Sequence, residues 1–360
     1  MIRRILATIA VALAAGATSH ADADRWWSHV KALADDSMEG RNTGSAGHKR
    51  AAEYVAAQFQ KAGLEPAGTS GFIQAVKFKT RKIVESGSSL ALVRDGRTEQ
   101  LALGEDANLS VRVDPAPSIE AGLVFAGYGL SVPEMSFNDL DDPTIKDAIR
   151  NSVVVYLSGS PSNIPGPLRA HYQSAGERWA ALKRAGAIGA ISIANPKSMD
   201  IPWSRSTLAR LQPAMTLADS SLDDTPGQQF AAAINPAHAD KLLAGSGHIF
   251  QELLALADAG KPLPRFPLPA RVKATVKVER GEVESQNIAG VLRGTDPSRR
   301  NEFVVVSAHV DHLGIGEPIN GDRIYNGAMD NASGTAAIIE VATQLHELGQ
   351  RPRVPFCFLR

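Results

Sequence analysis

The sequence of 360 residues has little cysteine and no surplus of either charge. Its single cysteine, Cys357, excludes an intramolecular disulfide and a zinc site built on thiolates. A metal ion in this protein must therefore be held by His, Asp and Glu side chains. Lys and Arg together number 38, as do Asp and Glu, so no net charge draws the chain to nucleic acid or to an anionic membrane.

Long apolar runs are also scarce. The strongest, Ile5–Ala15, follows Arg3 and Arg4 and precedes a small-x-small cleavage pattern at residues 21–23. The run is too short to cross about 30 Å of hydrocarbon comfortably. A cleaved signal peptide over residues 1–23 is therefore favoured over a membrane anchor. We expect an exported mature protein, periplasmic or extracellular, without a transmembrane anchor.

The length favours two domains over one, and the spacing of apolar residues locates them. Residues 24–115 begin with two amphipathic helices, at about 26–33 and 46–62, and continue as β-hairpins. In the second helix we expect Ser45 as the N-cap and His48 as a solvated residue of the first turn.

Residues 116–270 are predicted to form a self-contained β-rich module with one or two helices. The module ends in a proline-rich stretch, 262–269, which favours an extended connector. Residues 271–360 return to strands. Within them, 303–308 is a near-continuous apolar strand of the kind buried on both faces of a sheet, and 333–348 is a helix.

Candidate metal-binding residues follow that strand and precede that helix. His309 and Asp311 are two apart, so in an extended chain they point to the same side. A carboxylate there can fix the tautomer and the ring orientation of a metal-bound imidazole. Asp330 lies directly before the helix, where unpaired N–H groups and the helix dipole favour a carboxylate. Together these features predict part of a metal-hydrolase site.

Each residue alone also has an ordinary structural explanation. A lone histidine near a strand end is more often a hydrogen-bonded residue than a ligand, Asp330 is a good helix cap, and Asp322 fits a turn. His312 would face away from its neighbour Asp311 in a strand, which gives it a lining or substrate-side role. A serine hydrolase finds little support, because no Gly-x-Ser-x-Gly elbow is present.

The combined pattern resembles the two-zinc aminopeptidases of metallopeptidase family twenty-eight. The resemblance rests on Ser307–Gly314 (SAHVDHLG), on Asn326–Gly334 (NGAMDNASG) and on an early Gly-Arg loop at residues 39–45. It implies an α/β fold, in which a three-layer zinc-aminopeptidase-like sheet domain, here incomplete, carries an inserted β-rich protease-associated domain at 116–270. The Ala185–Ala190 turn is similar to part of that insert.

The resemblance also implies roles and cofactors. His309 would ligate one zinc ion, Asp311 would orient His309, and Asp330 would bridge two zinc ions. The Asp330–Asn331 peptide bond would be cis. Two zinc ions would activate a hydroxide that hydrolyses the N-terminal bond of a peptide substrate.

The sequence departs from the family pattern after about Arg353. A strand ending in a Glu-Glu pair, which supplies the general base and a ligand, is expected there and is not found, nor are two later ligands. Glu340 and Glu347 lie along the helix, away from its N-terminal end. We therefore expect full zinc binding to fail and activity to be low, as in a fragment or frameshifted product. The alternative is a non-catalytic peptide- or partner-binding protein.

Overall fold

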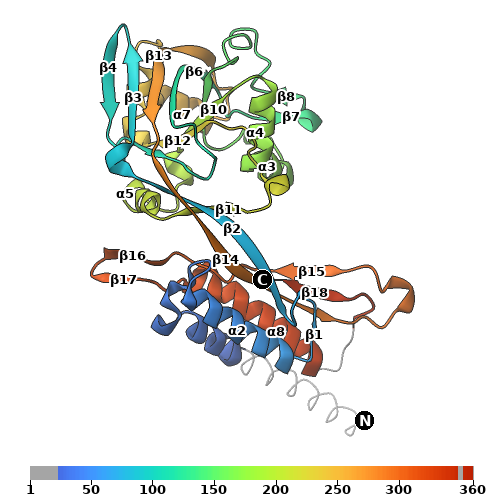
Figure 1. Ribbon diagram of the computed structural model, residues 1–360. Coiled ribbons are helices and arrows are strands. Elements are labelled where there is room, and N and C mark those ends of the chain that lie inside the picture. The colour runs from blue at the N-terminus through green and yellow to red at the C-terminus, as the bar shows by residue number, and fades with distance from the viewer. Residues whose placement is uncertain (1–22, 348–351, 360) are drawn as a thin grey trace, which may run out of the picture. The chain divides into compact units, whose positions relative to one another are not determined.

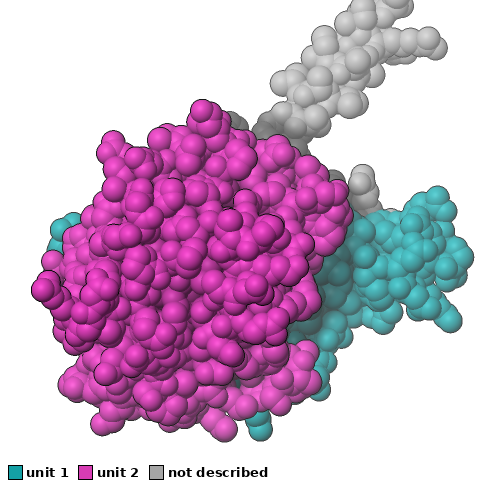
Figure 2. Space-filling view, turned by 90° about the horizontal axis from the view of Figure 1, so that it is seen from above, with its two compact units in different colours: residues 1–78, 283–360 teal, residues 79–282 magenta. Residues whose placement is uncertain are grey.

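The computed structural model describes residues 23–347 and 352–359 (Figure 1). Nearly all of the predicted signal peptide lies outside these residues. The chain divides into two compact units: residues 1–78 with 283–360 form unit 1, and residues 79–282 form unit 2 (Figure 2). None of the helices in the described part of the chain has the length and hydropathy of a membrane span.

Unit 1 is built from both ends of the chain. Residues 23–33 are helical. The elements that follow are η1 (Asp36–Arg41), α2 (Ala46–Lys61), β1 (Glu65–Pro66), β2 (Ile73–Ile83), β14 (Val278–Leu292), η8 (Pro297–Arg299), β15 (Val304–Ser307), β16 (Gly314–Ile319), β17 (Asp322–Tyr325), η9 (Ala328–Ala332), α8 (Ser333–Glu347) and β18 (Phe356–Leu359). Strands β2 and β14 continue across the boundary into unit 2.

The sheet of unit 1 is covered by α2 and α8, which lie side by side (Figure 1). Within unit 1 the strand order is β2-β14-β18-β15, with β1 paired to β14. Phe59 of α2, Ile339 of α8 and Phe358 of β18 are fully or almost fully buried in one core. The predicted α2 is confirmed: the Ser45 side chain accepts a hydrogen bond from the backbone N–H of His48, which closes the first turn.

Unit 2 is a mixed sheet with the order β4-β3-β13-β6-β9-β10-β12-β5. Strands β6, β9, β10 and β12 run parallel, and the outer pairs are antiparallel. The bounds are η2 (Glu85–Gly87), β3 (Ser89–Arg94), β4 (Arg97–Leu101), β5 (Ala107–Leu109), β6 (Ser118–Ala126), β7 (Ser131–Val132), η3 (Pro133–Met135), β8 (Phe137–Asn138), β9 (Val153–Leu157), α3 (Gly166–Tyr172), α4 (Ala175–Arg184), β10 (Gly189–Ile193), η4 (Pro196–Ser198), α5 (Trp203–Ser206), η5 (Thr207–Leu211), β11 (Ala214–Leu217), η6 (Ser220–Leu222), β12 (Phe230–Ile234), η7 (Pro236–His238), α6 (Asp240–Leu243), α7 (Phe250–Asp258) and β13 (Arg265–Thr275).

Both faces of the unit 2 sheet are buried, because successive residues of its central strands enter different cores. Val153 and Val155 of β9 pack in the core that holds Leu253 of α7. Val154, between them, packs with Trp179 of α4. Helices therefore cover both faces of this sheet. Residues 116–270, predicted as a β-rich module with one or two helices, contain the helices α3 to α7, so that prediction was wrong in its helix content. The predicted α/β class of the chain is confirmed.

The boundaries between the compact units lie at 78/79 and 282/283, whereas the predicted domain boundaries were 115/116 and 270/271. The reason is that β13 pairs with β3 on one side and with β6 on the other, which brings the hairpins after residue 78 into unit 2. The prediction of a proline-rich connector was wrong in part. Pro267 and Pro269 lie inside β13. Pro269 falls where the register shifts between Leu268 and Arg271, and such a bulge tolerates proline.

Two predictions near the C-terminal end of the chain need correction. Strand β15 forms, but it is not buried on both faces: Val304 is 41% exposed and Val305 56%, because β15 is the last strand in the sheet order of the described residues. The strand that was not expected after Arg353 does form, as β18, although it carries no Glu-Glu pair. Pro355 precedes β18, which then pairs antiparallel with β14 and parallel with β15, inside the sheet.

Candidate functional site

The candidate site lies in unit 1, where β15 ends and α8 begins. After Ser307 the chain leaves the sheet, so residues 308–313 are irregular rather than extended. The hairpin of β16 and β17 follows, and η9 then leads into α8. Asp330 and Asn331 have non-helical backbone angles within η9, and the peptide bond between them is cis, as predicted.

Histidine and carboxylate side chains from the two segments meet. His309 Nε2 lies 3.0 Å from Asp330 Oδ1. On the other side of the ring, His309 Nδ1 is 3.1 Å from the backbone oxygen of Asp311 and 3.5 Å from its Oδ1. The structure therefore places the three residues singled out by the sequence in one group, with the His309 ring between the two acidic residues.

Asp330 is not a helix cap. Asn331 caps α8 instead, because its Oδ1 accepts the backbone N–H of Gly334 at 3.0 Å. A Cβ at Gly334 would lie 2.4 Å from that oxygen, so glycine is what lets the cap close. The Asp330 carboxylate is thereby left to face His309, with 70% of its side chain exposed.

His312 lies closer to Asp330 than we expected for a residue in an extended strand. Because residues 308–313 are irregular, His312 does not face the opposite side, and its Nδ1 is 3.8 Å from Asp330 Oδ2. Burial lowers the pKa of His312 below its ordinary value, while the Asp330 charge acts in the opposite direction. A lowered pKa favours the neutral imidazole, the form that binds metals.

Three residues near the site have contacts that the sequence did not predict. Arg41 is fully buried and hydrogen-bonded to both site segments. Thr43 Oγ1 donates to Asp311 Oδ2 at 2.8 Å. His48, expected to be solvated, is 4% exposed, and its Nδ1 lies 3.3 Å from Ser285 Oγ. The sequence signal for the role of Arg41 was the Glu39-Gly40-Arg41 turn. The site segments that Arg41 binds, however, lie almost 300 positions away in the sequence.

The donor set suits zinc in type but does not complete a site. Imidazole nitrogen and carboxylate oxygen are zinc donors, and a catalytic zinc usually has three protein ligands. Among residues 23–347 and 352–359, no three or more His, Cys, Asp or Glu side chains form a group that could hold a metal ion. At this position the described residues therefore bring together donors of the types that zinc binds, without a complete ligand group.

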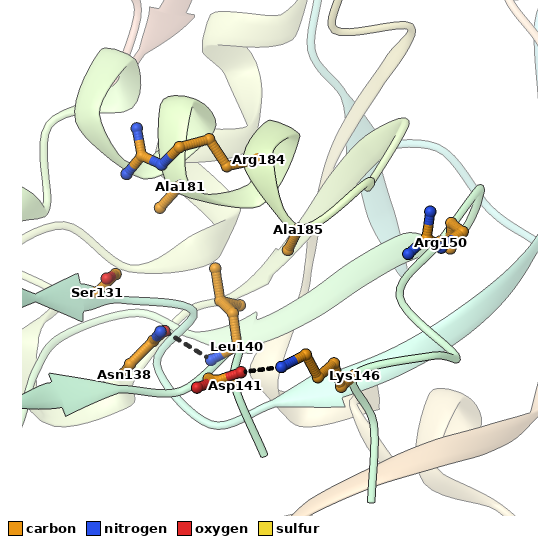
Figure 3. A pocket seen from close by; sticks show the side chains of 9 residues that line it. All are labelled: Ser131, Asn138, Leu140, Asp141, Lys146, Arg150, Ala181, Arg184 and Ala185. Atoms are coloured by element: carbon orange, nitrogen blue, oxygen red, sulfur yellow. Dashed lines mark hydrogen bonds and ion pairs between the residues drawn. The ribbon is translucent and has the colours of Figure 1, made fainter. Parts of the chain in front are cut away.

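A separate pocket of about 270 Å³ lies in unit 2, lined by residues of the β7–β8 hairpin, of α4 and of the segment that precedes β9. Lys146 Nζ pairs with Asp141 Oδ1 at 2.6 Å within it. Figure 3 shows Arg150 and Arg184 at opposite sides of this pocket and not pointing toward one another. Its basic side chains therefore do not converge on one ligand position.

Comparison with known proteins relates the segment that carries the site to peptidases. Residues 287–359 match the model of Peptidase family M28. This match includes His309, Asp311 and Asp330 and continues through β18. No curated protein matches the chain.

Solved structures of similar proteins are distant in sequence. An aminopeptidase from Aneurinibacillus sp. strain AM-1 is 17% identical, with a TM-score of 0.44 over 94% of this chain and 61% of its own. BSAP, a zinc aminopeptidase from Bacillus subtilis, is 18% identical, with a TM-score of 0.41 over 94% and 60%. A Peptidase M28 precursor from Shewanella amazonensis SB2B is 16% identical, with a TM-score of 0.45 over 93% and 62%. The chain spans about three fifths of the length of these structures.

Proposed function

We propose that this chain carries the first part of the metal centre of a zinc-dependent aminopeptidase. The observation that carries the proposal is the 3.0 Å approach of His309 Nε2 to Asp330 Oδ1, at the end of a strand and the start of a helix. The family match over residues 287–359 supports it. In this proposal His309 and Asp330 would hold the zinc, and Asp311 would orient His309.

The substrate is a peptide with a free N-terminus, and the protein works after export. The signal-peptide pattern of residues 1–23 supports export. Residues 116–270 act as a protease-associated module within this assignment. When bound, zinc supplies the activated water that attacks the scissile carbonyl.

Turnover by the 360-residue polypeptide alone is expected to be low. The described residues offer no complete ligand group. A positioned general base contributes about 10²- to 10⁴-fold to such a reaction, and no carboxylate assigned to that role is present at the site. The same observation favours a second candidate function, a non-catalytic protein that binds peptides.

An assay of the purified full chain separates these functions. Release of N-terminal residues from aminoacyl p-nitroanilides and short peptides is measured with added zinc and with a chelator, alongside peptide binding. Weak turnover that the chelator abolishes supports the peptidase assignment. Rapid turnover with two bound zinc ions contradicts the expectation of low activity. Peptide binding that survives chelation, without turnover, contradicts the peptidase assignment and supports the second candidate.

A further inference from the structure

We infer that Arg41 is the positioning residue that fixes the segment bearing His309 relative to the segment bearing Asp330. The inference rests on the proposed function only in treating these two residues as metal ligands. Its basis is the set of partners of one guanidinium group, which is fully buried in unit 1.

The Arg41 guanidinium donates hydrogen bonds to the backbones of three separate segments. Nε donates to the carbonyl oxygen of Val310 at 2.7 Å, between His309 and Asp311. Nη1 donates to Asn326 at 2.7 Å and Nη2 to Gly327 at 2.9 Å, just before η9. Nη1 also donates to Leu33, at the end of the helical residues 23–33. One planar group therefore links both site segments to the N-terminal helix.

The backbone of the same turn strengthens this link. Glu39, Gly40 and Arg41 all have positive φ, at 51°, 62° and 52°. This left-handed turn directs the Arg41 side chain inward, and the Arg41 carbonyl accepts the backbone N–H of His312 at 3.2 Å. Arg41 thus contacts the His309 segment through both its side chain and its main chain.

The pattern of partners distinguishes positioning from simple charge pairing. Within the described residues, every hydrogen bond from the Arg41 guanidinium goes to a neutral carbonyl, and none goes to a carboxylate. Its positive charge still acts on Asp311 and Asp330 at longer range. Lysine keeps that charge, but its single ammonium group cannot reach all the carbonyl oxygens that the planar guanidinium group binds.

Arg41→Lys therefore tests geometry at constant charge, and Arg50→Lys is a matched control. Arg50 lies in α2, and its side chain is 41% exposed in a pair with Glu39. In metal-free protein, Arg41→Lys should speed backbone amide exchange in residues 308–313 and 326–332 by at least about tenfold. Amide exchange in α2 and in unit 2 should not change. A general loss of packing would instead speed amide exchange throughout unit 1.

Metal uptake provides a second measurement with Co²⁺ as the spectroscopic probe. Arg41→Lys should weaken Co²⁺ binding and alter its visible absorption, and Arg50→Lys should leave both unchanged. If the unaltered protein takes up no metal, the proposed function fails, while the exchange comparison still decides the role of Arg41. Unchanged exchange at both site segments in a folded Arg41→Lys protein overturns the inference.

The unaltered protein offers a test if Arg41→Lys does not fold. A guanidinium held by four carbonyls rotates slowly, so NMR should resolve separate Nη proton signals for Arg41. Averaged Nη signals, like those of exposed arginines, would overturn the inference.

Discussion

His309 differs from the other histidines of the described chain in having an acidic residue near each ring nitrogen. Nε2 meets Asp330 Oδ1 at 3.0 Å, and Nδ1 meets the backbone and side-chain oxygens of Asp311 at 3.1 and 3.5 Å. A metal-binding imidazole commonly has such a partner on its second nitrogen. This arrangement is compatible with the proposed division of roles, in which Asp330 is a ligand and Asp311 orients His309.

Replacing Asp311 should weaken zinc binding without abolishing it. Loss of an orienting partner typically costs about 10- to 100-fold in metal affinity. We expect a decrease of that size for Asp311→Ala in a competition titration against a chromophoric chelator. Asp147→Ala, at an exposed position of unit 2, is the control and should bind zinc as the unaltered chain does. An Asp311→Ala protein with unchanged affinity would rule out the orienting role.

The buried histidines His29 and His48 are expected to make the stability of unit 1 depend on pH. Burial lowers the pKa of His29 and of His48 below the ordinary value of 6.5. For His29, Glu340 opposes the shift and Arg25 adds to it. Because these groups bind protons more weakly in the folded state, the unfolded state holds more protons and stability rises with pH. The stabilisation is complete above about pH 6.5 and is lost as the pH falls below it.

We therefore expect the urea midpoint of unit 1, followed by hydrogen exchange of α2, to fall between pH 7.5 and pH 5. His48→Gln should reduce this dependence. His171→Gln should leave it unchanged, since the side chain of His171 is 56% exposed. A midpoint that stays constant or rises on acidification would contradict the burial argument.

At the scale of elements, the turn η1 is the part of unit 1 that joins the early chain to the site. A Cβ built on Gly40 would lie 2.6 Å from the backbone oxygens of both Gly314 and Tyr325, at the two ends of the β16–β17 hairpin. Backbone atoms cannot move aside as the end of a side chain can. Glycine at position 40 therefore allows η1 to contact the hairpin closely.

Gly40→Ala should destabilise unit 1 more than Gly71→Ala, because Gly71 has nearly the same φ but open surroundings. Gly40 has φ of 62° and Gly71 of 63°, but no atom lies within 4 Å of a Cβ at Gly71. The left-handed backbone cost is common to both, so the difference reports the clash. We expect about 1–3 kcal/mol in unfolding free energy by urea denaturation. Equal losses in the two variants would show that η1 can move away from the hairpin.

Elements whose formation depends on neighbouring residues could be predicted from the sequence. The N-cap Ser45 and the helical spacing of apolar residues over about 46–62 predicted α2 almost to the residue. The polar cluster around His309 and Asp330 predicted which side chains meet. Burial of β15 could not be predicted in this way, because it depends on which strands lie beside it.

Contacts between distant parts of the chain were the features that could not be predicted. The Arg41 hydrogen bond to Val310 joins residues 269 positions apart. Arginine is seldom fully buried, and composition gives no sign of a guanidinium that binds only carbonyls. The burial of His48 against Ser285 is of the same kind. The periodic pattern placed His48 on the helix, but its burial depends on β14.

At the scale of the whole molecule, the residues of the candidate metal site and the larger of the two main sheets belong to different compact units. Residues 79–282 form unit 2 as one continuous segment, while unit 1 needs both flanking segments to complete its core. All the residues assigned to the metal centre belong to unit 1. The proposed function therefore depends on unit 1 bringing residues 36–43 to the segments 307–314 and 326–334.

Zinc binding by the purified chain tests the central claim most directly. Competition titrations compare the unaltered protein with His309→Ala, Asp330→Ala and His171→Ala, the last an exposed histidine of unit 2. The account predicts weak but saturable zinc binding by the unaltered chain, below that of a complete two-zinc site. The first two substitutions should abolish it, because each removes one of the two proposed ligands, and the third should leave it unchanged. Equal zinc uptake by all four proteins, or none by the unaltered chain, would contradict the assignment of His309 and Asp330 as a metal site.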